Sequence, residues 1–308
     1  MFSKELHTQQ YHAWTLCPTI LLAIIIAGCS DGAESARKVT GTVKDANGNN
    51  YPKTTISLSD GAKTIETATN ASGMFEFTAV DAGLYDISIT APLSTTLVAP
   101  IPTTVEVKED MVSTVDFVIQ PLALAPHVVI GDADIFNEIK DVDGGIPDMP
   151  GDLIYAQNVF DPPIGLLTAI TSPDDQHMTL IEWKNALGNV TVNCSGNSSA
   201  VNVSLQNLIP NGTYTLWCDF LNKKKSVGEF VNLGADIEKI EPLGSGTQNI
   251  AIADANGSIN TTFSHGSCIL TETPGLVIAV IYHINGNTYG AAHIPDEEEV
   301  NHLLVYFQ

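Results

Sequence analysis

Four histidines near the C-terminus are the residues whose type is best suited to metal chemistry. They are His265, His283, His293 and His302, and they fall near the ends of segments that are expected to be strands. Neutral imidazoles that converge from strand ends can bind copper or zinc. The sequence contains no His-x-His pair and no cysteine closely followed by histidine and methionine. Two interpretations therefore stand: a transition-metal site, or separate histidines that are exposed or singly hydrogen-bonded.

A second set of candidate ligands is acidic. Asp141, Asp143, Asp148 and Asp152 lie in a short stretch with Gly144 and Gly145. Closely spaced carboxylates supply the oxygen ligands that Ca²⁺ prefers, and the stretch resembles the calcium loops of thrombospondin type 3 repeats. It departs from that pattern because one acidic position between the glycines is missing and no second repeat follows. The alternatives are a weak calcium site and a solvated acidic linker.

Motifs for other chemistry are absent from the sequence. It has no Gly-x-Ser-x-Gly nucleophile motif, no phosphate-binding Gly-x-x-x-x-Gly-Lys-Ser/Thr loop and no dinucleotide fingerprint. Trp217 would stack on a sugar ring if it were exposed on a sheet face, whereas packing beneath a helix at 179–187 is the alternative. Apart from the calcium possibility, no cofactor is expected.

The N-terminal residues predict where in the cell the protein resides. An apolar run from Thr19 ends in Ile26-Ala27-Gly28-Cys29, which is too short to span a bilayer and has the length of a signal-peptide core. This quartet resembles the lipobox of bacterial lipoproteins, which implies that Cys29 is acylated and becomes the first mature residue. Ser30 then favours sorting to the outer membrane. The alternative is an ordinary cleaved signal peptide.

Composition and charge narrow the class of partner. The chain has 308 residues, 44% of them hydrophobic, and 13 basic against 35 acidic residues give a net charge of −22. Such a surface repels nucleic acid, so nucleic-acid binding is excluded. Without Cys29 and the leader, Cys194, Cys218 and Cys268 remain, with no Cys-x-x-Cys spacing. Three cysteines allow one disulfide and one buried thiol in an oxidising compartment.

Residues 39–120 consist of short alternating segments separated by Gly, Asn and Asp turns, which predicts an antiparallel β-sandwich. The runs at residues 39–48, 69–77 and 82–87 (VTGTVKDANG, TNASGMFEF and AGLYDI) resemble the carboxypeptidase regulatory-like domain. That resemblance implies a transthyretin-like sandwich used for spacing or adhesion. It supplies no catalytic residues.

Residues 121–163 are rich in Pro, Gly and Asp and are predicted to connect this domain to a second one, with both ends packing as strands on the second domain. In residues 164–308, Thr179 and Glu182 form a capping-box pattern that begins a short helix, with Gly188 as its expected end. Residues 249–263 are expected to form a hairpin. The apolar run 276–282 is expected to be a central strand covered on both faces. Together these patterns predict a second, Ig-like sandwich.

The runs at 208–217, 266–268 and 282–290 look like a recurrent, uncharacterised domain of secreted prokaryotic proteins. That likeness transfers no activity. It does imply that Cys194 and Cys268 form the disulfide and that Cys218 is a core thiol.

The sequence therefore predicts an all-β protein of two antiparallel sandwiches in tandem: leader 1–28, tether 29–38, first sandwich 39–120, connection 121–163 and second sandwich 164–308. The first functional hypothesis is a non-enzymatic envelope lipoprotein. Its partners would be the lipid bilayer, through acylated Cys29, and a polysaccharide or protein ligand. The second hypothesis is a metal-dependent or hydrolytic enzyme built on the C-terminal sandwich.

Overall fold

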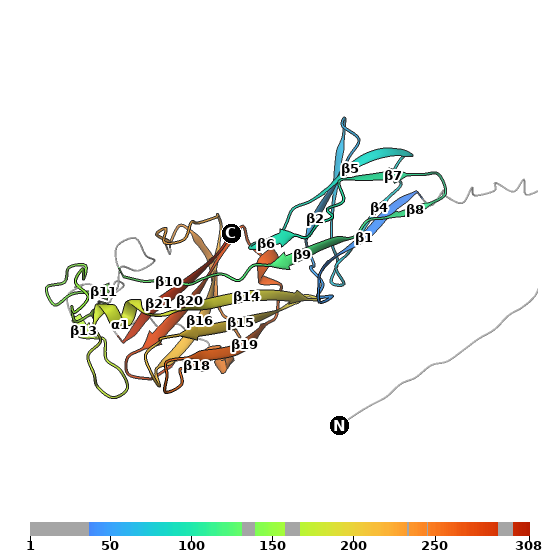
Figure 1. The fold of residues 1–308 in the computed structure, drawn as a ribbon. Helices are drawn as coiled ribbons and strands as arrows, with labels where there is room; N and C mark the ends of the chain where they lie inside the picture. The colour runs from blue at the N-terminus through green and yellow to red at the C-terminus, as the bar shows by residue number, and fades with distance from the viewer. Residues whose placement is uncertain (1–36, 131–138, 158–166, 233, 245, 289–297) are drawn as a thin grey trace, which may run out of the picture. The chain divides into compact units, whose positions relative to one another are not determined.

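The structure is a computed structural model that describes residues 37–130, 139–157, 167–232, 234–244, 246–288 and 298–308 (Figure 1). The predicted leader, the lipidation site Cys29 and His293 lie outside these residues. In the described part, no helix is long and apolar enough to cross a membrane. The described residues are almost all β-structure in several mainly antiparallel sheets with one short α-helix, as the predicted fold class requires.

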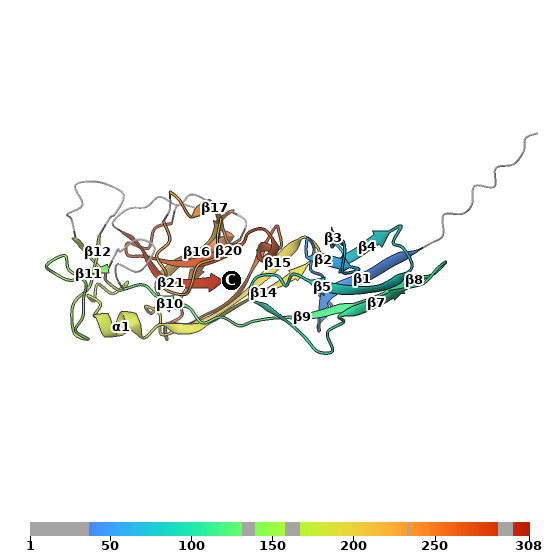
Figure 2. The ribbon, with the colours of Figure 1, turned by 90° about the horizontal axis from the view of Figure 1, so that it is seen from above.

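The first sandwich packs a five-stranded sheet on a four-stranded sheet (Figure 2). The larger sheet has the order β4-β1-β9-β6, with β8 also paired to β1, and contains β1 (Lys38–Asp45), β4 (Met74–Thr78), β6 (Thr95–Leu97), β8 (Val112–Thr114) and β9 (Phe117–Pro121). The smaller sheet has the order β3-β2-β5-β7 and contains β2 (Thr55–Ser59), β3 (Thr64–Ala68), β5 (Gly83–Ile89) and β7 (Thr104–Val107). Alternate residues of β1 are buried, as a strand with one core-facing side requires.

One part of the predicted antiparallel pairing is wrong, because β1 runs parallel to β8 and β9. Val115 and Asp116 separate β8 from β9. There the chain crosses close to Gly41, where a Cβ would lie 1.7 Å from the carbonyl oxygen of Val115. The carboxylate of Asp116 accepts hydrogen bonds of 2.8 Å from both the backbone N–H and the hydroxyl of Thr42.

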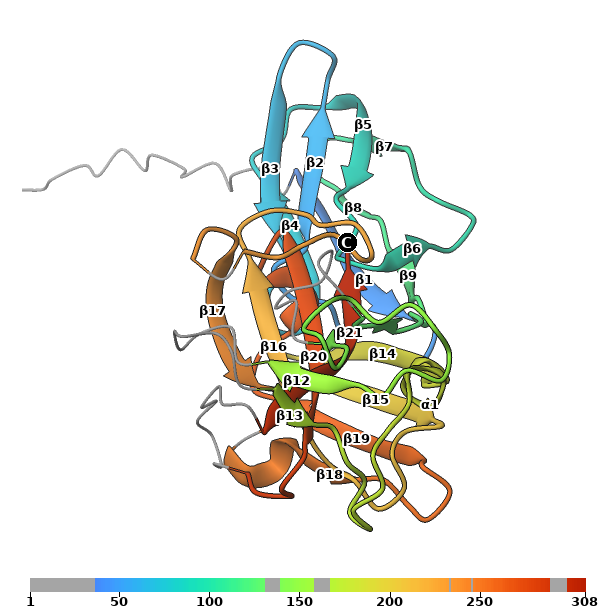
Figure 3. The same cartoon turned by 90° about the vertical axis from the view of Figure 1, so that its left-hand side faces the viewer.

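The second sandwich packs a six-stranded sheet on a three-stranded one (Figure 3). The larger sheet has the order β10-β21-β20-β16-β17, with β18 also paired to β16, and contains β10 (His127–Val128), β16 (Thr213–Leu221), β17 (Ile237–Pro242), β18 (Ile250–Ile252), β20 (Gly275–His283) and β21 (Glu299–Phe307). The smaller has the order β14-β15-β19: β14 (Leu187–Ser195), β15 (Ser198–Gln206) and β19 (Ile259–His265). Every residue of β20 is buried between β16 and β21, which confirms the predicted central strand.

The predicted hairpin at 249–263 is wrong. Its two halves are β18, which pairs with β16, and β19, which pairs with β15, so they belong to different sheets. The turn between them passes close to Leu208, and the N–H of Leu208 donates to the carbonyl of Gly257 at 2.9 Å. This turn therefore carries the chain from one layer of the sandwich to the other, which brings the end of β19 to the edge of the larger sheet.

The stretch expected to be a connection carries strand β10 and most of a small sheet, β11 (Ile139–Lys140), β12 (Tyr155–Gln157) and β13 (Leu167–Ala169). Next to it, α1 (Leu180–Lys184) begins with the predicted capping box between Thr179 and Glu182. The helix ends at Lys184, with Asn185 rather than Gly188 as its C-cap. Gly188 instead lies in β14, where a Cβ would be 2.1 Å from the carbonyl oxygen of Ser204. The two short 3₁₀ helices are η1 (Gly246–Asn249) and η2 (Ile269–Thr271).

A polar pocket around His265

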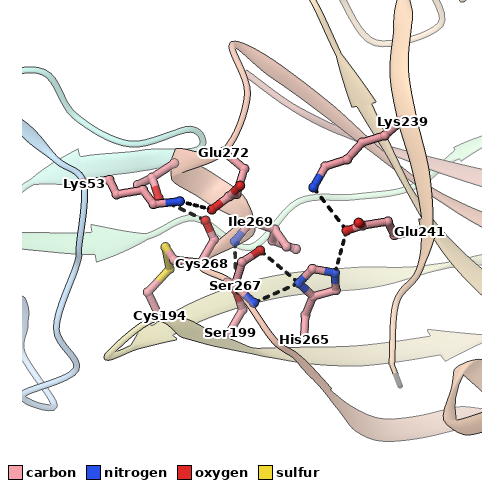
Figure 4. Close-up of polar contacts among 11 residues, drawn as sticks. Lys53, Cys194, Ser199, Lys239, Glu241, His265, Ser267, Cys268, Ile269 and Glu272 are labelled. Atoms are coloured by element: carbon pink, nitrogen blue, oxygen red, sulfur yellow. Dashed lines mark hydrogen bonds and ion pairs between the residues drawn. A yellow bond between two sulfur atoms is a disulfide. The ribbon is translucent and has the colours of Figure 1, made fainter. Parts of the chain in front are cut away.

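The candidate site is built on the loop that joins β19 to η2, residues 266–268 (Figure 4). Cys268 at the end of this loop is bonded to Cys194 at the end of β14 in a disulfide with a Cα–Cα distance of 5.3 Å. This is the pairing that the sequence resemblance implied. The disulfide ties the loop to the smaller sheet.

The hydroxyl of Ser199 holds the same loop on its other side. It donates to the carbonyl of Ser267 at 2.6 Å and accepts the N–H of Ile269 at 3.0 Å. Ser199 is 2% exposed, so both hydrogen bonds are shielded from water. The loop is therefore fixed by one covalent bond and two buried hydrogen bonds, which gives the side chains around it a defined geometry.

His265 is the central side chain of the site. Its Nε2 atom lies 3.3 Å from a carboxylate oxygen of Glu241, and its Nδ1 atom lies 3.2 Å from both the backbone nitrogen and the hydroxyl of Ser267. The backbone N–H can only donate, so Nδ1 must be the acceptor and the neutral ring carries its proton on Nε2. The imidazole thus links the fixed loop to β17.

Glu241 also contacts Lys239, whose ammonium nitrogen lies 3.3 Å from the same carboxylate oxygen. That ammonium group stands 4.2 Å from the ring centre of Phe220, a cation–π contact. Because residues alternate along β17, Lys239 and Glu241 share one face of the strand. The result is a row of a cation, an anion and an imidazole along the edge of the sandwich.

Two adjoining cavities open beside this row. The first has a volume of about 460 Å³ and is lined by Lys239, Glu241, Pro242, Gly244, His265, Gly266, Ser267 and Glu272. The second, of about 250 Å³, is lined by Pro52, Lys53, Asn197, Gly266, Ser267, Cys268 and Glu272. Loop residues Gly266 and Ser267 are common to both, as is Glu272. Lys53, on the turn before β2, forms an ion pair with Glu272.

A third cavity of about 320 Å³ continues from Lys53 along residues 90–93 and 270–274. Hydrogen bonds close to it join the first sandwich to the second. The N–H of Leu93 donates to the carbonyl of Leu270 at 3.2 Å, and the N–H of Ser94 donates to the carbonyl of Gln308 at 2.8 Å. The three cavities therefore form a series. Its lining contains one imidazole, two ion pairs and several hydroxyl groups, and the third cavity adds Lys224 and apolar side chains such as Leu93 and Leu270.

The other described histidines do not join His265, so the predicted convergence is wrong for these three. His302 lies on β21 and contacts Tyr214, while His283 lies on β20 and contacts Thr215. Tyr214 and Thr215 are neighbours on β16, so their side chains point to opposite faces of the sheet. Among the described residues, no group of three or more His, Cys, Asp or Glu side chains is placed to hold a metal ion.

The contacts of His302 are those of a side chain that stabilises the core. Its ring stacks on Trp183 at a centroid distance of 3.7 Å, and its Nε2 atom lies 2.9 Å from the Trp183 carbonyl oxygen. Burial lowers the pKa of His302 from 6.5 to about 4. The side chain is therefore neutral at physiological pH and helps to pack α1 against β21. His283 is also buried, with Nδ1 at 3.4 Å from Glu299 and Nε2 at 2.8 Å from the hydroxyl of Thr215.

The acidic stretch folds on itself instead of forming one cluster of carboxylates. Asp141 accepts hydrogen bonds from the N–H groups of Asp143 and Gly145, at 2.9 and 2.8 Å. Asp152 accepts from the N–H groups of Asp148 and Met149, at 3.2 and 2.8 Å. Two of the four predicted calcium ligands thus cap turns, and the described part of this stretch holds no group of three or more acidic side chains placed around one point.

Trp217 and Cys218 both lie in the interior of β16. Trp217 is 4% exposed and donates its indole N–H to Thr215 at 3.0 Å, so it offers no platform for a sugar. Cys218 is a buried free thiol whose pKa is raised by burial. Sequence reasoning missed Ser267, Glu241, Lys239 and the pair of Lys53 with Glu272. The implied disulfide at Cys268 was the signal that pointed to this loop.

Comparison with known families identifies the first sandwich. Residues 38–120 match the family model of the carboxypeptidase regulatory-like domain, which confirms the resemblance predicted for residues 39–120. This domain is a module of the chain and covers less than half of its length. No match was found among curated proteins.

Solved structures similar to the whole chain share little sequence with it. A DUF3823 family protein from Bacteroides ovatus is 8% identical, with 86% of this chain and 97% of that chain covered and a TM-score of 0.26. A candidate carbohydrate-binding protein from Bacteroides uniformis is 10% identical, with 87% and 94% covered and a TM-score of 0.26. The major pilin SpaD from Corynebacterium diphtheriae is 11% identical, with 89% and 65% covered and a TM-score of 0.28. Similarity at this level carries no information about ligand or activity.

Proposed function

We propose that this chain is a lipid-anchored protein of the bacterial cell envelope whose primary role is to bind a polysaccharide in the pocket around His265. The observation that carries the proposal is the fixed loop 266–268 between two cavities, each with an ion-paired side chain in its lining. A loop that is already held by a disulfide and by Ser199 loses little conformational entropy when a ligand binds. This favours recognition over a role as a passive spacer.

The side chains that line the pocket suit a neutral ligand with many hydroxyl groups. Its charges occur as pairs, Lys239 with Glu241 and Lys53 with Glu272. Each pair presents a donor beside an acceptor, which complements sugar hydroxyl groups that both donate and accept. The net charge of −22 repels polyanions over distances of about 8 Å at physiological salt. A neutral polysaccharide therefore suits the pocket better than an acidic one.

The variant Glu241→Gln tests this site. It keeps the shape of the side chain but removes the charge that holds Lys239 and His265, so we expect binding of a neutral polysaccharide to weaken about 10-fold. The matched control is Glu238→Gln, because Glu238 is exposed on the same strand and lines neither cavity. Isothermal titration calorimetry of both variants measures the difference. Equal affinity of the two variants would place the binding site elsewhere.

The anchor is a separate part of the proposal. It is supported by the lipobox-like quartet that ends at Cys29 and by the disulfide in the second sandwich, which suits an oxidising compartment. Cys29→Ser removes the thiol that would be acylated, so we expect the protein to move from the membrane fraction to the soluble fraction. Immunoblotting of fractionated cells measures this shift. An unchanged distribution would contradict the lipid anchor.

A further inference from the structure

The side chains at His265 also have the connectivity of a nucleophilic site. A hydroxyl group, an imidazole and a carboxylate follow one another: the Ser267 hydroxyl is 3.2 Å from Nδ1 of His265, and Nε2 of the same ring is 3.3 Å from Glu241. In this order a serine is activated when the ring takes its proton, while the carboxylate holds the ring and stabilises the positive charge that forms. We propose that Ser267 attacks oxygen esters, with His265 as general base and Glu241 as the residue that orients it.

The tautomer required for this reaction is set by the backbone. Because the N–H of Ser267 donates to Nδ1 of His265, that nitrogen carries the lone pair of the neutral ring, and the Ser267 hydroxyl lies at the same distance of 3.2 Å from it. The other ring nitrogen then presents its N–H to Glu241. The loop therefore selects the tautomer whose Nδ1 can accept a proton from Ser267.

Access to Ser267 is open. Ser267 and Gly266 line both the 460 Å³ and the 250 Å³ cavities, and a Cβ built on Gly266 would meet no atom within 4 Å. A substrate can therefore approach the hydroxyl from either cavity. Lys239 lines the larger cavity together with Ser267.

The reaction balances with water as the only co-reactant. Ser267 Oγ forms a bond to the carbonyl carbon as its proton moves to Nδ1 of His265. The bond from that carbon to the alcohol oxygen then breaks, and the alcohol leaves with this proton. Water attacks the acyl-serine, gives one proton to Nδ1, and releases the carboxylic acid as Ser267 recovers its proton. The inference goes beyond ligand binding and concerns a second property of the same pocket.

Covalent labelling of the full-length protein tests this inference. A fluorophosphonate probe reacts only with activated hydroxyl groups, so we expect it to label Ser267, as located by peptide mass spectrometry. Hydrolysis of p-nitrophenyl acetate should be lost in Ser267→Ala and should fall about 100-fold or more in His265→Gln. The matched control is Ser264→Ala, since Ser264 is exposed on the opposite face of β19 and should keep the wild-type rate.

Ser267→Ala leaves the backbone hydrogen bonds of the loop in place, so its fold should be retained, and its unfolding temperature checks this. A wild-type protein with no label on Ser267, or a Ser267→Ala variant with the wild-type hydrolysis rate, would overturn the inference. Calorimetry with a polysaccharide on the same samples reports binding separately. A protein that binds polysaccharide but takes no label would therefore overturn the esterase inference and leave the proposed function standing.

Discussion

Asp219→Asn is expected to stabilise the protein at pH 8 by about 4 kcal/mol and to have little effect at pH 4. Asp219 lies inside β16 and is 3% exposed, and burial raises the pKa of its carboxyl group from 3.8 to about 7. In the unfolded chain the carboxyl group has its ordinary pKa. Between the two pKa values the folded protein therefore keeps a proton that the unfolded chain has released. The stability that this group contributes is therefore fully present below about pH 4 and is lost as the pH rises to about 7.

The size of the effect follows from the shift. About three pKa units at about 1.4 kcal/mol each give a loss on the order of 4 kcal/mol above pH 7. Asparagine keeps nearly the same shape and carries no charge at any pH, so it avoids the cost of a buried carboxylate. Urea unfolding of both proteins at pH 4 and pH 8 measures the difference. A change in unfolding free energy that is the same at both pH values would show that Asp219 does not titrate in this range.

His302 changes the unfolding free energy with pH in the opposite direction to Asp219. Its contribution cancels when the wild-type and Asp219→Asn proteins are compared at the same pH. Its pKa is lowered by burial from 6.5 to about 4. The unfolded chain binds this proton first, so the stability that depends on neutral His302 is present above about pH 6.5 and is lost as the pH falls towards 4. Both proteins share this slope, so their difference reports Asp219 alone.

The second large effect is expected when the disulfide is removed. Cys194 and Cys268 are 74 residues apart in sequence, and closing a loop of that length restricts the unfolded chain by about 4 kcal/mol in the chain-entropy model. The double variant Cys194→Ser with Cys268→Ser should lose about this much unfolding free energy. Because the bond also holds loop 266–268, we expect its polysaccharide affinity to fall as well. Urea unfolding and calorimetry measure the two changes.

Cys218→Ala is the control for this double variant. It removes the buried free thiol of β16 and leaves the disulfide intact. We expect a smaller loss of unfolding free energy and wild-type affinity, since Cys218 does not line the pocket cavities. If the double variant binds as tightly as the wild-type protein, the disulfide does not maintain the pocket and its role is confined to stability.

Local patterns predicted the elements well where a single segment determines its own structure. The capping box predicted where α1 begins, because the hydrogen bonds between Thr179 and Glu182 form within one helical turn. The unbroken apolar run of β20 predicted a strand buried on both faces. The first sandwich was recognisable because its motif includes Gly41, which a crossing chain requires at that point in β1.

Pairing between distant segments could not be predicted in the same way. The turn at residues 254–257 has the composition of a hairpin turn, but the choice between pairing β18 with β19 and sending each to a different sheet depends on β15 and β16. The same long-range choice assembles the pocket. Glu241 and His265 come from strands of different sheets, and nothing in the sequence near either residue indicates the other.

The acidic stretch shows that spacing along the sequence does not by itself bring carboxylates together. Asp141 and Asp152 are placed as calcium ligands would be in sequence, yet each carboxylate accepts N–H groups of its own loop. In each case a single carboxylate oxygen accepts both N–H groups, which fixes the turn around it. The spacing of the acidic residues predicts their number in the loop but not that each of these two caps a turn of its own.

The central claim is that the charge-balanced pocket around His265 binds a neutral polysaccharide, and calorimetric titration of the wild-type protein tests it most directly. The titration compares a neutral with a polyanionic polysaccharide at low and at physiological salt. We predict binding of the neutral polymer with an affinity that changes little with salt, because the ion pairs at Lys53 and Lys239 leave no net charge to screen. Binding of the polyanion alone, with an affinity that falls as salt rises, would contradict the account.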